Sequence, residues 1–129
     1  MNRTRTHPSA DIANTAATDC LAAWLTAPTT RNVMVAAGNT PIELYRRIGE
    51  RGLKLAHLNV FALDEYVGVP LEEPRNCANL MRRCVQQVWG IPPTQFHTVS
   101  SLEANALTSV QAHERKINQA GGLDVIILG

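Results

Sequence analysis

The chain has 129 residues, of which 45% are apolar and 18% charged, so it suits one ordinary globular domain. Twelve basic and eleven acidic residues leave a formal charge of +1, which argues against a nucleic-acid partner or an anionic membrane surface. No apolar run approaches the roughly 20 residues of a membrane-spanning helix. The polar residues 1–9 lack the apolar stretch of a signal peptide, and we expect them to form a flexible tail.

The cysteines and histidines do not form a recognisable metal-binding or disulfide pattern. The cysteines are odd in number and form no CxxC pair, so they predict neither a disulfide framework nor a zinc site, and a cytoplasmic protein is expected. Cys77 and Cys84, seven residues apart on one helix face, are expected to be small buried residues. No histidine has the spacing of a metal ligand pair, and we interpret all four as structural or surface residues. These residues are Cys20, Cys77, Cys84, His7, His57, His97 and His113.

A helix over 10–25 is predicted first, because apolar residues recur there at helical spacing. The recurring residues form two sets, Ile12, Ala16 and Cys20, and Ala13, Ala17, Leu21 and Trp24. A short buried strand over 33–36 follows. The next helix has a predicted N-cap at Thr40, a proline at its first position and a capping-box partner at Glu43. Its expected buried face is Leu44, Tyr45 and Ile48.

The remaining elements continue the alternation of strands and helices. A strand over 58–63 precedes a helix that Asn76 caps and Gly90 ends. The expected apolar stripe of this helix is Cys77, Leu80, Met81, Cys84, Val85, Val88 and Trp89. A short strand over 96–99 is followed by a helix with capping-box spacing between Ser100 and Glu103, and a last strand spans 123–128. The stripe of that helix is Ala106, Val110, His113 and Ile117.

Strands with continuous apolar runs that alternate with helices predict an α/β fold. We expect a three-layer α/β/α arrangement around a parallel, Rossmann-like sheet, with the strands over 33–36, 58–63 and 123–128 as neighbours. Ligands of such sheets bind at the carboxyl ends of the strands. Function is therefore sought in the segments that directly follow these three strands.

Gly38, Asn39 and Thr40 follow the first strand at the start of a predicted helix. Free amides and the positive end of the helix dipole would suit a phosphate there, although an ordinary strand-to-helix turn has the same pattern. The segment is neither a dinucleotide fingerprint nor a P-loop. We expect its amides to face the same crevice as Asp64.

Asp64 and Glu65 follow the second strand. Because strand side chains alternate, one carboxylate could face the crevice while a structural partner holds the other. A solvated acidic turn is the alternative. Arg75, Arg82 and Arg83 could bind phosphate, but a solvated helix face is the favoured interpretation for the last two.

Four segments, in this order, resemble the glucosamine/galactosamine-6-phosphate isomerase (deaminase) family. They are VMVAAGNTPIELY at 33–45, LNVFALDEYVGVP at 58–70, EEPRNCANLMRR at 72–83 and GGLDVIILG at 121–129. DEYVG is the most specific element. The family also contains 6-phosphogluconolactonases, which resemble DER rather than DEY at this point.

The resemblance implies conversion of an amino-sugar phosphate to a ketose phosphate plus ammonia. Asp64 would be the base that moves a proton between C2 and C1. Gly38, Asn39, Thr40 and Glu65 would bind the sugar phosphate, and no metal or organic cofactor is implied. The resemblance leaves a homo-oligomer open.

The sequence departs from the family at Ala37, where threonine is frequent, and at Asn39, where glycine is frequent. It also ends at Gly129, before the family's glycine-rich catalytic loop and its phosphate-gripping basic residues. We therefore expect 10–129 to be the N-terminal part of one isomerase domain, truncated and inactive or weakly active. The alternatives are a 6-phosphogluconolactonase-like hydrolase and a non-catalytic sugar-phosphate-binding fragment, so enzyme activity of this chain is left open.

Overall fold

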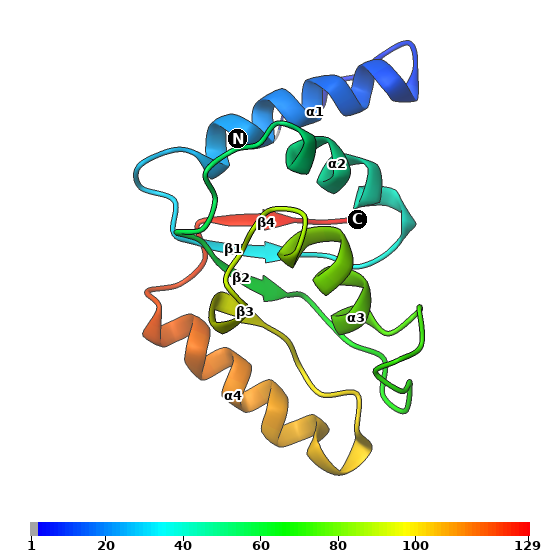
Figure 1. The fold of residues 1–129 in the computed structure, drawn as a ribbon, viewed down its shortest axis with the longest axis vertical. Coiled ribbons are helices and arrows are strands. Elements are labelled where there is room, and N and C mark those ends of the chain that lie inside the picture. The colour runs from blue at the N-terminus through cyan, green and yellow to red at the C-terminus, as the bar shows by residue number, and fades with distance from the viewer. Residues whose placement is uncertain (1–2) are drawn as a thin grey trace.

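The computed structural model describes residues 3–129 and contains a four-stranded parallel sheet flanked by helices (Figure 1). The strands are β1 (Asn32–Val35), β2 (Asn59–Ala62), β3 (Phe96–His97) and β4 (Val125–Ile127). Their order in the sheet is β3-β2-β1-β4, and every neighbouring pair is parallel. The predicted α/β fold and the parallel pairing of the three main strands are thus confirmed.

The helices are α1 (Ala10–Leu25), α2 (Asn39–Glu50), α3 (Cys77–Met81) and α4 (Ala106–Gln119). The helix of α3 continues as a π-helical segment, η1 (Arg82–Gln86). Short 3-10 turns at Pro93–Gln95 and Glu103–Asn105 precede β3 and α4. Within residues 3–129, no helix is long and apolar enough to cross a membrane.

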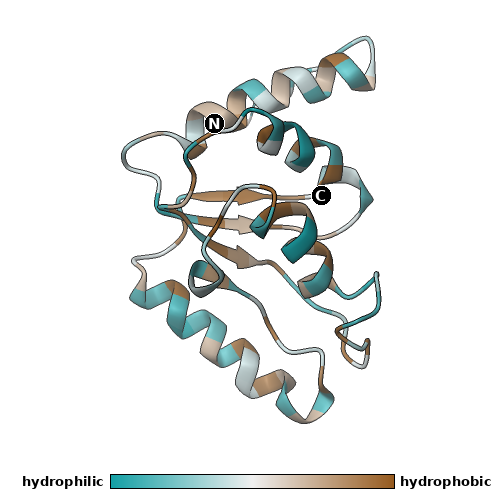
Figure 2. Cartoon of the chain, viewed as in Figure 1, coloured by the Kyte–Doolittle hydropathy of each residue, from teal (hydrophilic) through white to brown (hydrophobic). Residues whose placement is uncertain are grey.

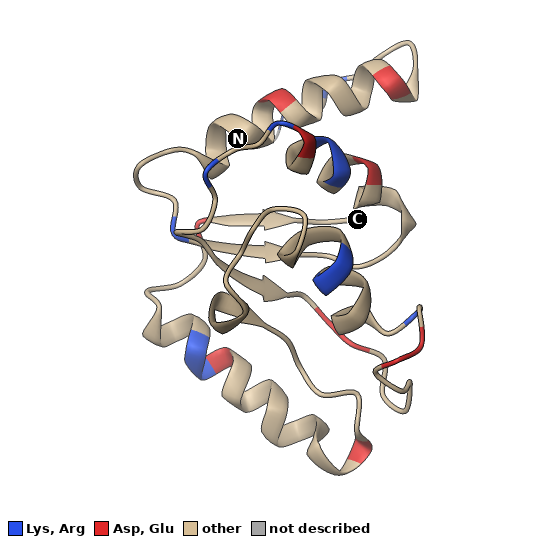
Figure 3. Ribbon diagram, viewed as in Figure 1, with Lys and Arg blue, Asp and Glu red and all other residues tan. Residues whose placement is uncertain are grey.

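The first face of the sheet, which we call the apolar face, is covered by α1, α2 and the α3–η1 helix. Alternate strand residues, among them Val33, Val35 and Val60, join one continuous buried cluster with side chains of these helices. The helix side chains in this cluster are Leu21, Leu25, Tyr45, Ile48, Met81, Val85 and Trp89. Figure 2 shows the strands as predominantly hydrophobic, and Figure 3 shows that none of them carries a charged residue.

The second face, which we call the polar face, is covered by α4, which Figure 1 shows well apart from α1, α2 and α3. His113 of α4 packs edge-on against Phe61 of β2, and His97 of β3 stacks on the same ring. Asn32 of β1 donates hydrogen bonds of 2.8 Å to the carbonyls of Ala120 and Gly122, just beyond the end of α4. Helices on both faces complete the predicted three layers.

The predicted bounds of α1 match the structure, but of the recurring apolar residues only Leu21 is buried. Ile12, Cys20 and Trp24 are exposed, whereas the buried residues are Thr18, Leu21, Ala22 and Leu25. The alanine-rich sequence gives several equivalent stripes, so periodicity alone does not choose among them. Thr18 can be buried because its hydroxyl donates to the Asn14 carbonyl at 2.7 Å.

The predicted capping box of α2 is also wrong. The helix begins at Asn39 with Gly38 as its N-cap, and no side chain caps it. Glu43 instead accepts hydrogen bonds from Arg46 and Arg47, which lower the pKa of Glu43 from 4.5 to about 2. Two guanidinium groups outcompete a backbone amide for this carboxylate.

The predicted apolar stripes fail at two valines. Val88 and Val110 are exposed. In η1 the Gln87 amide donates to the Arg82 carbonyl, five residues back, so the wider turn rotates the following residues and moves Val88 out of the stripe. Before α4, a 3-10 turn replaces the box predicted between Ser100 and Glu103, and Ser100 Oγ instead accepts from the Leu102 amide at 3.1 Å.

The N-terminal segment before α1 is only partly described, since residues 1 and 2 of the predicted tail lie outside the described residues. Ser9 is the N-cap of α1, and its hydroxyl accepts from the Ile12 amide at 3.2 Å. Arg3, Arg5 and His7 lie along α1, where they line a shallow hollow together with Trp24. The flexible tail over 1–9 stays a prediction.

Candidate functional site

A pocket of about 450 Å³ lies at the carboxyl ends of β1 and β2. Its walls come from three segments: the loop between β1 and α2, the segment after β2, and the first turn of α3. The lining residues are Ala37, Gly38, Asn39, Asp64, Tyr66, Pro74, Arg75, Cys77 and Leu80. This is the edge of a parallel sheet at which ligands bind.

The loop between β1 and α2 presents backbone amides to this pocket. Gly38 has φ of 123°, a conformation that only glycine adopts without strain, and it starts α2 directly beside the pocket. Since no side chain caps the helix, its first amides and the positive end of its dipole are available to an anion. Gly38 and Asn39 line the pocket, whereas Thr40 lies in the first helical turn and does not.

The two adjacent carboxylates have different surroundings. Asp64 lines the pocket and is exposed to solvent. Glu65 accepts hydrogen bonds from the amides of Cys77 and Ala78 at 2.9 and 2.8 Å, so it binds the N-terminus of α3. The structure therefore brings Asp64 together with Gly38 and Asn39, and directs Glu65 away toward α3.

Cys77 is a wall residue of the pocket that the sequence marked only as a small buried residue. Burial, and secondly the nearby Glu65 carboxylate, raise the pKa of the Cys77 thiol to about 11. The thiol is therefore protonated near neutral pH and is a poor nucleophile. The signal that could have placed it in the site is its position in the first turn of the helix that follows the Asp64 loop.

His113 supports the Asp64 segment from the polar face of the sheet. Its Nε2 donates to the Ala62 carbonyl at 2.8 Å, two residues before Asp64. Nδ1 is buried, and it has no hydrogen-bond partner within residues 3–129. Burial lowers the pKa of His113, which favours the neutral imidazole that this arrangement requires.

A larger hollow of about 660 Å³ lies between the segments that follow β2 and β3. It is lined by Glu65, Arg82 and three serines, but it contains neither Asp64 nor the start of α2. We place the candidate site in the smaller pocket, because Asp64 and the uncapped start of α2 meet there. Across the described residues 3–129, no three His, Cys, Asp or Glu side chains are arranged to hold a metal ion.

The parallel sheet, its helices on both faces and a pocket at the carboxyl ends of its strands define an α/β protein. Residues 6–129 match the family model described as "Glucosamine-6-phosphate isomerases/6-phosphogluconolactonase", and the chain belongs to this family.

Curated relatives of the chain are glucosamine-6-phosphate deaminases. The protein from Cutibacterium acnes is 34% identical over 99 residues, which cover 74% of this chain and 38% of the relative. The protein from Porphyromonas gingivalis is 31% identical over 96 residues, which cover 71% of this chain and 36% of the relative. The matched part of the chain thus spans less than half the length of these relatives.

Solved structures show the same fold. A monomeric glucosamine-6-phosphate deaminase superposes with a TM-score of 0.77 at 18% identity, over 86% of this chain and 48% of the other. A 6-phosphogluconolactonase from Thermotoga maritima superposes with a TM-score of 0.75 at 23% identity, over 92% of this chain and 54% of the other. At these identities the likeness shows the fold alone.

Proposed function

We propose that this chain carries the proton-transfer part of an amino-sugar-phosphate isomerase/deaminase site, with Asp64 as the base. The supporting observation is that Asp64 lines one pocket with the uncapped start of α2. A carboxylate beside free helix amides is suited to a substrate that is both acidic at carbon and anionic at phosphate. The relatives named as glucosamine-6-phosphate deaminases support the same substrate class.

In the proposed reaction the Asp64 carboxylate takes the proton from C2 of the open-chain amino aldose. The same proton returns to C1 while one amine proton moves to O1, so the aldehyde becomes an alcohol and the amine becomes an imine at C2. Water then adds to C2 and ammonia leaves, so that one water is consumed for each ketose phosphate and ammonia formed. A base that serves both carbons must lie over the C1–C2 bond, and the end of a rigid strand provides such a fixed position.

Substrate binding is assigned to the loop after β1. We propose that the amides of Gly38 and Asn39 contact the ligand and that Thr40 contributes from the first turn of α2. Glu65 acts as a positioning residue, because its two oxygens are occupied by the amides at the start of α3. No metal or organic cofactor is part of this proposal.

The test joins this chain to the remaining part of the Cutibacterium acnes deaminase and measures ammonia and fructose 6-phosphate production from glucosamine 6-phosphate. Asp64→Asn should lower kcat by roughly 10² to 10⁴-fold, the usual contribution of a positioned base. Asp19→Asn, on α1, is the matched control and should leave kcat unchanged. An Asp64→Asn variant that works at the wild-type rate would overturn the proposal.

The 129-residue chain is expected to show no enzyme-like turnover when it is assayed alone. By the resemblance, the ring-opening group and further basic residues that contact the phosphate lie beyond the matched segment, and groups that act as a unit are strongly non-additive. Comparable rates from the chain and the joined protein would contradict this expectation.

A 6-phosphogluconolactonase-like hydrolase is the second candidate, because the family model covers both activities and a lactonase shares the fold. Tyr66 in the DEY sequence favours the first candidate. Hydrolysis of 6-phosphogluconolactone by the joined protein, without ammonia release from glucosamine 6-phosphate, would reverse this preference.

We also propose that the protein works in the cytoplasm and that it forms a homo-oligomer. The three free cysteines, Cys20, Cys77 and Cys84, support a reducing compartment. Ile126 and Leu128, exposed at the β4 edge of the sheet, support self-association. Analytical ultracentrifugation over a concentration series tests the oligomer.

A further inference from the structure

We propose that Arg75 is the residue that selects phosphorylated over unphosphorylated sugars in the Asp64 pocket, an inference that rests on the proposed function. The guanidinium of Arg75 would be the specificity-determining cation of this pocket, because the carboxylate of Asp64 would otherwise repel an anionic ligand.

The charge balance of the pocket calls for such a cation. Among its lining residues, Arg75 is the only positively charged one and Asp64 the only negatively charged one. A sugar phosphate carries about two negative charges at neutral pH, so Asp64 alone would oppose its binding. The partial charge at the start of α2 offsets part of this repulsion, and a guanidinium in the same pocket offsets more.

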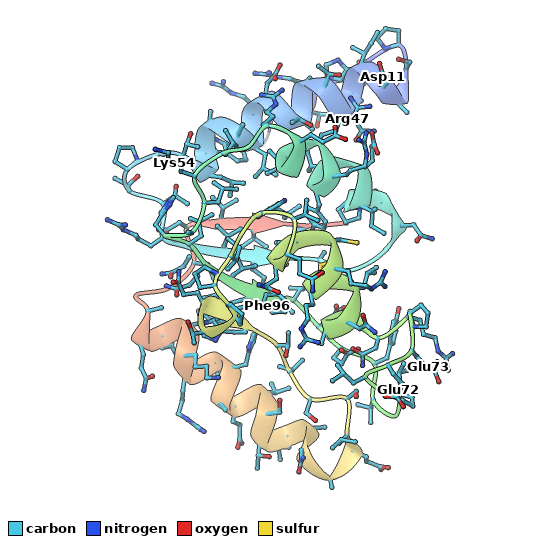
Figure 4. The ribbon with its side chains drawn as sticks, in the orientation of Figure 1. Asp11, Arg47, Lys54, Glu72, Glu73 and Phe96 are labelled. Carbon is cyan, nitrogen blue, oxygen red and sulfur yellow. The ribbon has the colours of Figure 1, made fainter. Side chains whose placement is uncertain are left out.

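The backbone around Arg75 is fixed, although the side chain itself is 71% exposed. Asn76 donates from Nδ2 to the Val69 carbonyl at 3.0 Å, and its Oδ1 accepts from the Asn79 amide at 2.9 Å. Glu65 holds the next two amides of α3. Arg75 therefore stands on an ordered loop at the edge of the pocket, and Figure 4 shows its neighbours Glu72 and Glu73 at the outer side of the same loop.

One neighbour orients the guanidinium without occupying it. Arg75 Nε donates to Glu73 Oε2 at 2.7 Å, and neither Nη has a hydrogen-bond partner within residues 3–129. The two Nη groups form a planar fork that matches two oxygens of a phosphate. Glu73 thus limits rotation of the side chain and leaves the end that binds phosphate free.

The other two arginines considered from the sequence do not share this position. Arg83 donates to Asn79 Oδ1 at 3.0 Å on the solvent side of the helix. Arg82 lines the larger hollow, which lacks Asp64. Arg75 alone of the three shares a pocket with the proposed base.

The test measures the affinities of the chain for glucosamine 6-phosphate and for glucosamine by calorimetry or by NMR titration. Arg75→Gln should weaken glucosamine 6-phosphate binding roughly tenfold or more, the usual loss for a charge-assisted hydrogen bond. Its affinity for glucosamine should stay within about twofold of wild type, since no phosphate contact is lost. Arg75→Lys, which keeps the charge and loses the fork, should fall between wild type and Arg75→Gln.

Arg115→Gln on α4 is the matched control, because it removes the same charge from an exposed residue outside the pocket. Equal affinities of Arg75→Gln and wild type for glucosamine 6-phosphate would overturn the role of Arg75 and leave the proposed function standing. Equal losses for both ligands would also overturn it, because they would indicate general damage to the pocket. A wild-type chain that binds no sugar phosphate would overturn this inference together with the proposed function.

Discussion

The two faces of the sheet are held by different kinds of interaction. On the apolar face, three helices bury a continuous cluster in which Ile48 and Tyr45 are fully inaccessible to solvent. On the polar face, α4 buries only His113 and leaves Leu107 and Val110 exposed. Hydrogen bonds to backbone carbonyls hold α4 where apolar contacts are few.

The stability of the fold and the positioning of individual groups therefore come from different faces of the sheet. Burial of apolar surface is non-directional, so the apolar face stabilises the fold without fixing any one group finely. Hydrogen bonds from Asn32 and His113 are directional, and they fix the carbonyls just beyond the C-terminal end of α4 and at the C-terminal end of β2. Of these bonds, the one from His113 lies near the pocket that contains Asp64, because Ala62 is the last residue of β2.

The largest effect is expected from a cavity on the apolar face. Ile48→Ala should lower the free energy of unfolding by about 2–5 kcal/mol, because the removed atoms leave a void in a packed cluster. Urea denaturation followed by circular dichroism measures the change. Leu107→Ala on α4, where the side chain is 71% exposed, should stay within about 0.5 kcal/mol. Equal losses from the two variants would contradict the distinction between the faces.

A smaller loss is expected when the polar network is cut. The Asn32 side chain donates to two carbonyls and accepts from Asn59 Nδ2 at 3.0 Å. Asn32→Ala should therefore cost about 1–3 kcal/mol, since buried polar groups lose their partners. Hydrogen exchange should increase mainly in α4 and β4. Asn118→Ala, at an exposed position of α4, serves as the control, and faster exchange in α1 as well would argue against a local role.

Acid should weaken the attachment of α4. The folded-state pKa of His113 is lowered from 6.5 by burial, so its contribution to stability is complete above pH 6.5 and is lost as the pH falls toward the folded value. One proton gives a slope of at most about 1.4 kcal/mol per pH unit. The positive charge of Lys116 also lowers the pKa of His113 and so opposes its protonation.

The measurement for this prediction is the unfolding free energy between pH 7.5 and 5. His113→Gln should reduce the pH dependence, because the titrating group is gone. An unchanged profile in His113→Gln would assign the effect to other groups.

The smallest effect is expected at the outer surface of the helices on the apolar face. Asp11 of α1 accepts from Arg47 of α2 at 2.6 Å, and Figure 4 shows the two side chains together. Asp11→Asn should lower Tm slightly at low salt and not at all near 1 M salt, because exposed ion pairs contribute little and are screened. Glu114→Gln on α4, which has no ion pair within residues 3–129, is the control. A large drop in Tm that persists at high salt would contradict this expectation.

The sequence predicted the fold better than it predicted local contacts. Continuous apolar runs and helical spacing gave the elements and their parallel order, because those patterns follow directly from burial of a two-sided sheet. The capping box at Thr40 and Glu43 failed because Arg46 and Arg47, one turn further along α2, bind the same carboxylate. The burial of Thr18 in place of Ile12 depends on which side of α1 meets α2, a tertiary choice.

For the candidate site, strand ends were the informative feature. The position of Asp64 and Glu65 after β2 predicted that they would have different partners, and Glu65 does bind the start of α3. The fold of the loop between β2 and α3 decides which of the two carboxylates faces the pocket. It also brings Cys77 and Arg75 to the same pocket. That loop is held by side-chain contacts such as Asn76 to Val69, which periodicity does not reveal.

In evolutionary terms, the sparse packing of α4 leaves most of its sequence free to drift. Its exposed apolar and polar positions accept substitution at little cost, whereas His113 is tied to the carbonyl of Ala62 beneath the Asp64 segment. Among the residues of α4, a change at His113 would thus be the one that affects the segment with Asp64. Lineages that diverge in α4 can alter the setting of the β2 terminus without changing any residue that lines the pocket.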